Sequence, residues 1–130
     1  MYSKTTHFIK ITVIPAFLPE QSDPLEHHYV WAYTIRMENI GGETSQLKNR
    51  YWHITDANGA VQEVHGPGVV GEFPTLQPGE HYQYTSGAAL KTPSGLMVGH
   101  YEMVTESGQP FLVDIPAFSL DSPDQIMRPN

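Results

Sequence analysis

The feature that most constrains the fold is a strict two-residue alternation between residues 29 and 38. The odd-numbered positions carry large apolar or aromatic side chains, and the even-numbered positions carry smaller or polar ones. The first set is Tyr29, Trp31, Tyr33, Ile35 and Met37. A helix would spread these rings around its circumference, whereas a strand places them all on one face. The pattern therefore predicts a strand with one buried face.

Similar apolar segments follow one another along the chain. The expected strands lie at residues 6–17, in two arms of 47–66, and at 78–87, 96–108 and 110–120. Asn58-Gly59 suits the tight turn between the arms of 47–66, because both residues tolerate positive φ angles. No stretch keeps a helical period over three turns, and eleven prolines and eleven glycines punctuate the chain. About seven antiparallel strands are expected, as an all-β sandwich rather than a barrel.

The length and ends of the chain predict one domain. The 130 residues suit a single domain over 1–130, with a core at about 6–120. We expect residues 17–28 to form an exposed loop crossing between the sheets, and residues 121–130 to be a flexible tail. The absence of cysteine excludes disulfides and thiolate nucleophiles.

The charge balance argues against nucleic acid as a partner. Seven basic residues are scattered among fourteen acidic ones, which gives a net charge of −7, whereas binding to phosphate backbones needs clustered cations. No signal peptide precedes the first strand, and no apolar run approaches the roughly 20 residues of a membrane helix. We therefore expect a cytoplasmic protein without a membrane partner.

Gly66, Gly68 and Gly71 have the G-x-G-x-x-G spacing of a dinucleotide-binding loop. Such a loop works when a helix starts directly after it and points its amino end at the pyrophosphate. Here two prolines follow within eight residues, and Glu72 would repel phosphate. The three glycines are therefore interpreted first as a turn or a partner-contacting loop, and second as an anion or nucleotide site.

Seven histidines raise the question of a metal site. The chain contains neither an H-x-H nor an H-E-x-x-H motif, and a transition metal needs three or four converging ligands. A site across strands, with His53 and His100 as ligands, is the alternative to scattered polar histidines. The sequence favours scattered histidines, with no bound cofactor.

Catalytic motifs are missing from the sequence. It has no cysteine and no G-x-S-x-G nucleophile elbow, so a non-enzymatic protein is expected. Tyr51 and Trp52 are adjacent on a predicted strand and should point to opposite faces. If Trp52 is the exposed member of the pair, it would favour a surface for binding peptide or protein.

Several ordered segments resemble the ApaG family. They are YVWAYTIRMENIG, NRYWHITDANG, VHGPGVVGEFPTLQPGEHYQYTSG, PSGLMVGHYEMV and FLVDIPAFSLDSP. The resemblance covers residues 6–123. This family is known from bacteria and as a module in some eukaryotic F-box proteins and a polymerase-delta-interacting protein. The resemblance implies an immunoglobulin-like or fibronectin type III-like sandwich, and the family name is associated with cobalt and magnesium tolerance.

This resemblance also guides the expected function. Tyr101, or else Tyr82, is the candidate for a structural tyrosine whose hydroxyl bonds to the backbone, as in immunoglobulin-type folds. The leading hypothesis is a module that binds a protein partner through a sheet face, a free edge or the loop at 64–74. A homodimer formed through an edge strand is a further expectation. The alternative is a nucleotide, pyrophosphate or divalent-metal binder that uses the glycine loop or the histidines.

Overall fold

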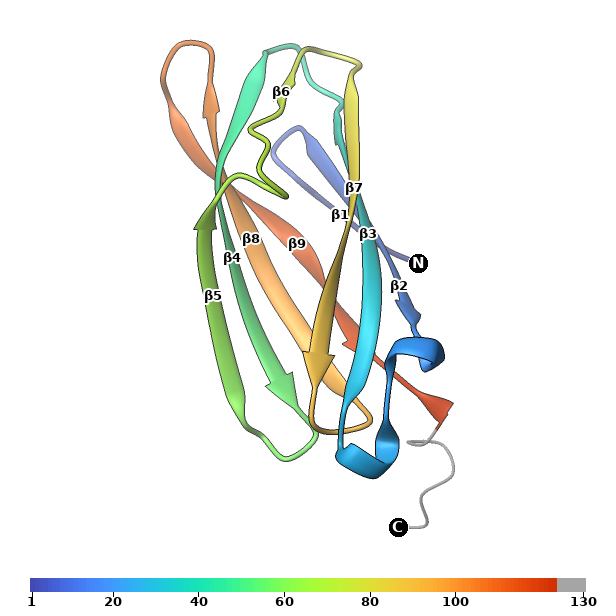
Figure 1. The fold of residues 1–130 in the computed structure, drawn as a ribbon. Coiled ribbons are helices and arrows are strands. Elements are labelled where there is room, and N and C mark those ends of the chain that lie inside the picture. The colour runs from blue at the N-terminus through green and yellow to red at the C-terminus, as the bar shows by residue number, and fades with distance from the viewer. Residues whose placement is uncertain (124–130) are drawn as a thin grey trace.

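The structure, a computed structural model, describes residues 1–123, and its regular secondary structure is almost entirely β-strand (Figure 1). The strands are β1 (Tyr2–Thr6), β2 (Ile9–Phe17), β3 (Tyr29–Asn39), β4 (Ser45–Asp56), β5 (Val61–Pro67), β6 (Thr75–Leu76), β7 (His81–Leu90), β8 (Gly95–Thr105) and β9 (Pro110–Leu120). Two short 3-10 helices, η1 (Pro19–Gln21) and η2 (Pro24–Glu26), lie between β2 and β3.

The strands form two antiparallel sheets packed as a sandwich, as predicted. One sheet has the order β1-β2-β3-β7, and the other has the order β5-β4-β8-β9 with β6 attached to β4. Seven long strands make up the body of the sandwich, which matches the expected number. The two shorter strands, β1 and β6, were not predicted.

The core lies between the sheets and is rich in aromatic side chains. The five residues whose alternation predicted β3 are all buried, with at most 5% of their surface exposed. Across the sandwich, Trp52 and Phe118 meet edge to face with ring centroids 5.8 Å apart, and Tyr33 contacts both rings. Burial of each large apolar side chain stabilises the fold by about 1.5–3 kcal/mol relative to exposure.

Two predictions about the N-terminal third were wrong. The segment 6–17 is not one strand, because β1 ends at Thr6 and a turn with His7 at φ 55° leads into β2. The loop at 17–28 does not cross between sheets, since β2 and β3 pair with each other along nine residues. Its two prolines instead start the 3-10 helices η1 and η2.

A β-bulge at Lys48 sets the orientation of β4. The register against β8 shifts between Leu47 and Asn49, and an extra residue in one strand reverses which parity faces the core. Leu47 therefore points inward before the bulge, and Trp52 points inward after it. Arg50, two residues before Trp52, lies on the same inward-facing side of β4, while Tyr51 lies on the outer face.

The two sides of the sandwich differ. On one side β1 contacts β9 through an ion pair between Lys4 and Asp114 at 2.9 Å and a hydrogen bond between Tyr2 and Ser119 at 3.0 Å. On the other side β5 and β7 are the edge strands, and neither has a second strand neighbour within residues 1–123.

The chain beyond β9 is tied to the body at its first residues. The Trp31 indole N–H donates to the carbonyl of Asp121 at 2.8 Å, and the Ser122 hydroxyl donates to the carbonyl of Pro93 at 2.7 Å. The flexible tail expected at 121–130 falls mostly on residues 124–130, which lie outside the described residues.

Candidate functional site

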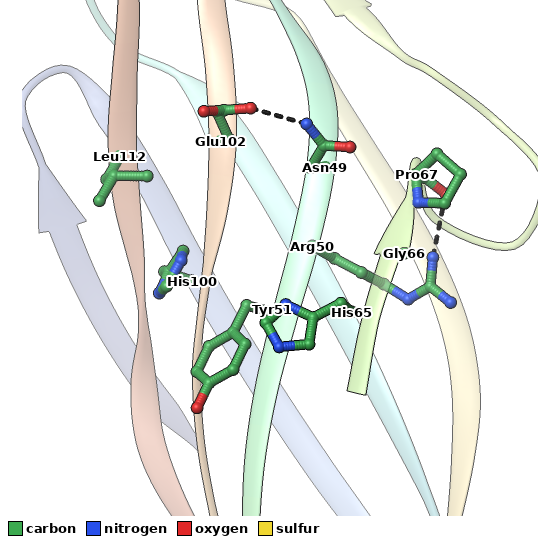
Figure 2. A pocket seen from close by; sticks show the side chains of 9 residues that line it. All are labelled: Asn49, Arg50, Tyr51, His65, Gly66, Pro67, His100, Glu102 and Leu112. Carbon is green, nitrogen blue, oxygen red and sulfur yellow. Dashed lines mark hydrogen bonds between the residues drawn. The ribbon is translucent and has the colours of Figure 1, made fainter. Parts of the chain in front are cut away.

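A row of three rings crosses the outer face of the five-stranded sheet. The backbone register pairs Tyr51 on β4 with His65 on β5 and with His100 on β8. The Tyr51 ring lies 4.8 Å from the His65 ring and stacks on the His100 ring at 5.0 Å, measured between centroids. Figure 2 shows the three side chains next to one another on this face.

A shallow depression of about 400 Å³ lies beside these rings (Figure 2). Asn49 and Glu102 form another part of its wall, and the Asn49 amide donates to the Glu102 carboxylate at 2.6 Å. Leu112 lines the depression from β9 and keeps 52% of its surface exposed. Aromatic, polar and apolar groups therefore meet at one concave site.

The apolar character continues along β8. Leu96 and Val98 point outward from the same face as His100 and are 44% and 41% exposed, while Met97 points into the core. Strands with one solvated face normally alternate apolar and polar residues. We call His65, Tyr51, His100, Leu96, Val98 and Leu112 the outer patch.

The carboxylates on this face already have partners. Glu63 accepts a hydrogen bond from the Tyr51 hydroxyl at 3.2 Å, and Asp114 pairs with Lys4. Desolvation, followed by the hydrogen bond and the negative charge of Glu63, raises the pKa of Tyr51 above its usual value. The phenol is therefore a neutral donor at physiological pH, rather than a base or a nucleophile.

His53 and His100, the residues predicted as candidate metal ligands, lie on the same outer face but in different cross-strand rows. His53 is opposite Val98, whereas His100 is opposite Tyr51 and stacked on it. Within residues 1–123, no group of three or more acidic or histidine side chains is arranged to hold a metal ion. The structure thus places the two histidines on one face of the sheet, and no ligand set is complete there among the described residues.

The three glycines of the G-x-G-x-x-G motif lie at the end of β5 and in the turn that follows. Val69 and Glu72 exchange two backbone hydrogen bonds at 2.9 Å each, and Val70 and Gly71 between them have φ angles of 49° and 79°. Positive φ at both central residues marks a tight two-residue hairpin turn. No helix follows Gly71, because the chain continues into β6.

Several backbone N–H groups of this loop already donate hydrogen bonds to backbone carbonyls. Besides Val69 and Glu72, Gly68 donates its N–H to the carbonyl of the bulge residue Lys48 at 2.9 Å. These three N–H groups are not free to hold a phosphate, and the helix dipole of a dinucleotide site is missing here. Anion binding by Gly66, Gly68 and Gly71 stays a prediction that nothing in this geometry favours.

The side chain of Arg50 lies against Gly66. Its guanidinium passes over Gly66 and donates from Nη1 to the carbonyls of Pro67 and Gly68 at 3.0 Å each. A Cβ atom at position 66 would lie 2.8 Å from the guanidinium nitrogens. These two bonds tie the Arg50 side chain to the loop, as a donor to backbone carbonyls.

Of two predictions about aromatic residues, the one that Tyr51 and Trp52 point to opposite faces is confirmed, and the one that Tyr101 bonds to the backbone is wrong. Trp52 is 3% exposed and belongs to the core, so Tyr51 is the member of the pair that faces outward. Tyr101 is fully buried, but its hydroxyl bonds to the hydroxyl of Tyr84 in the opposite sheet rather than to the backbone. It links the two sheets and is not a tyrosine corner.

The two packed antiparallel sheets define this chain as an immunoglobulin-like β-sandwich protein. The sequence profile of the ApaG domain matches residues 19–105. The chain belongs to the ApaG family.

Relatives match over nearly the whole chain. Protein ApaG of Rhodospirillum centenum is 61% identical over 130 residues and Protein ApaG of Paramagnetospirillum magneticum is 58% identical, with both chains covered completely. The crystal structure of an ApaA protein from Bordetella pertussis superposes with a TM-score of 0.86 at 46% identity, covering 95% of this chain and 98% of that one. Across residues 1–123, no helix has the length and apolarity needed to cross a membrane.

Proposed function

We propose that this ApaG-family chain is a non-enzymatic module that binds a protein partner on the outer patch. The observation that carries the proposal is the continuation of apolar and aromatic side chains onto the solvent side of the five-stranded sheet. Leu96, Val98 and Leu112 each expose more than two-fifths of their surface there. Exposed apolar surface next to a concave site is typical of protein-binding surfaces.

The rings of the outer patch support protein binding more than small-molecule chemistry. Tyr51 lies between two imidazoles and offers a rigid surface with a polar end, which is the type of group enriched at interfaces. The neighbouring carboxylates are bonded to Tyr51, Asn49 and Lys4. They stabilise the face, and we assign them no catalytic role.

The partner is expected to insert an apolar side chain beside Leu112 and to place basic groups near Glu63 and Glu102. These two acids border the outer patch, and the chain has a net charge of −7. Charge complementarity at the rim mainly accelerates association and selects the partner, while the apolar contact supplies most of the affinity.

A matched pair of sites tests the proposal. Leu112 on β9 and Ile14 on β2 are both 52% exposed, but Ile14 lies on the outside of the other sheet. A photoreactive amino acid at each position in living cells, followed by mass spectrometry of the adducts, should give a reproducible partner only from position 112. The Leu112→Glu variant should lose this partner, and Ile14→Glu should keep it. Equal adducts from both sites, or none from position 112, would contradict the proposal.

A further inference from the structure

The edge strand β7 is long, regular and unprotected. It pairs with β3 through ten consecutive residues, from His81 to Leu90, with no bulge in the register. Among residues 1–123, β7 pairs only with β3, beside which it lies in Figure 1. Its outer side therefore presents a regular row of backbone donors and acceptors.

The other sheet edges have features that prevent unwanted pairing. β1 carries Lys4 and is bound to β9 through Asp114, and β5 contains Glu63 and ends at Pro67. Proteins normally protect edges with charged residues, prolines, bulges or covering segments. From Tyr82 to Leu90, β7 contains no proline and no charged residue. Its edge is therefore open to pairing with a further strand.

A cleft of about 360 Å³ runs beside β7, between the open edges of the two sheets. Trp52, Ile54 and Met97 supply apolar surface to it, and Arg50 and Tyr33 supply polar groups. Because side chains of a strand alternate between its faces, a strand added to β7 would send every second side chain into this cleft. Backbone pairing and side-chain recognition could therefore occur together.

Arg50 has no acidic partner among residues 1–123. Its Nη1 donates to the carbonyls of Pro67 and Gly68, and it forms no ion pair with a carboxylate of the described residues. The residue is half-buried and lines the cleft. A planar guanidinium in such a position suits a carboxylate, which it can bind through two parallel hydrogen bonds.

We propose that β7 binds an extended segment of a partner protein as an added strand, and that Arg50 binds an Asp or Glu side chain of that segment. A second copy of the chain fits less well. The inward-facing residues of β7 are Tyr82, Tyr84, Ser86 and Ala88, and those of β5 are Gln62, Val64 and Gly66. None is acidic, so neither free edge of a second copy would supply the carboxylate.

This site shares Arg50 with the wall of the depression beside the outer patch, but β7 and Leu112 lie apart, so variants at those two places let the two proposals fail independently. The probe is the synthetic peptide KTVTDTVTK, which places Val, Asp and Val on one face when extended, and its matched control replaces Asp with Asn. Addition of the Asp peptide to the isotopically labelled protein should produce saturable shifts of the β7 amide signals. The Asn peptide should bind roughly tenfold more weakly, because one charge-assisted contact is lost.

Protein variants complete the test. Ala88→Lys places a charge on the inward side of the edge and should abolish the β7 shifts, while thermal unfolding verifies that the variant is folded. Leu112→Glu should leave peptide binding unchanged, since it alters only the outer patch. The proposal is overturned by equal binding of the Asp and Asn peptides, or by the absence of β7 shifts at millimolar peptide. A dimer would also overturn it. In that case sedimentation without peptide would show two copies, and the β7 amide signals would change with protein concentration.

Discussion

Three buried tyrosine hydroxyls should make this protein unfold sharply at alkaline pH. Desolvation raises the pKa of Tyr84 well above its usual value, partly offset by the hydrogen bond to Tyr101. Desolvation, together with the nearby Tyr84, raises the pKa of Tyr101 strongly. The pKa of Tyr33 is raised by desolvation, against the opposing effects of its bond to Ser86 and the charge of Arg50.

The sign of the effect follows from proton release. Below about pH 10 the three phenols are neutral in both the folded and the unfolded chain, so they add no pH dependence to the free energy of unfolding. Above that pH the unfolded chain loses protons that the folded protein keeps, and unfolding becomes more favourable. While a phenol is ionised only in the unfolded chain, it lowers the free energy of unfolding by about 1.4 kcal/mol per pH unit, so the three together give a slope of at most about 4 kcal/mol per pH unit.

Urea unfolding followed by tryptophan fluorescence between about pH 8 and pH 12 measures this slope. Tyr84→Phe should reduce the slope above pH 10 by about one third, because one phenol fewer ionises on unfolding. Ile35→Val serves as the control, since it should lower the free energy of unfolding by about 1 kcal/mol without changing the slope. The reasoning is refuted if phenolate absorbance shows all seven tyrosines ionising near pH 10 in the folded protein.

Two further substitutions test local features of the backbone. Val70 is a β-branched residue at φ 49° in an exposed turn, so Val70→Asn should raise the free energy of unfolding by about 1 kcal/mol, and an unchanged urea midpoint would contradict this strain. Asn39 is 1% exposed, and its side chain bonds the carbonyls of Glu43 and Leu76 and the amide of Gly41. Asn39→Ala should therefore lower the free energy of unfolding by about 2–4 kcal/mol, and a loss below 1 kcal/mol in the same assay would show that water replaces these bonds.

The sequence predicts the sandwich well because, in most of its strands, apolar residues that face the core alternate with residues that face outward. In β3 the alternation from Tyr29 to Met37 matches the buried face at every position. A turn also forms at the predicted Asn58-Gly59 position, but only Gly59 of the pair has a positive φ, of 85°. These features are local, so neighbouring residues are enough to specify them.

The missed features depend on contacts between distant segments. β1 is mostly polar and forms a strand through its pairing with β2, and the turn between them contains His7 instead of glycine or asparagine. The row of Tyr51, His65 and His100 exists only because the registers of β5, β4 and β8 align. One signal of the outer patch was available in the sequence. Leu96, Met97 and Val98 are consecutive apolar residues, so a strand through them must expose apolar side chains on its outer face.

The bulge at Lys48 also determines how this chain would respond to the loss of one residue in β4. Deletion of Lys48 would leave Leu47 and Asn49 opposite the consecutive residues Met103 and Glu102, so β4 would become a regular strand in which Tyr51 and Trp52 keep their faces. The carbonyl that holds the amide of Gly68 would be lost in the same event. The extra residue in β4 therefore serves the glycine turn, through the carbonyl of Lys48, rather than the division of β4 into an inner and an outer face.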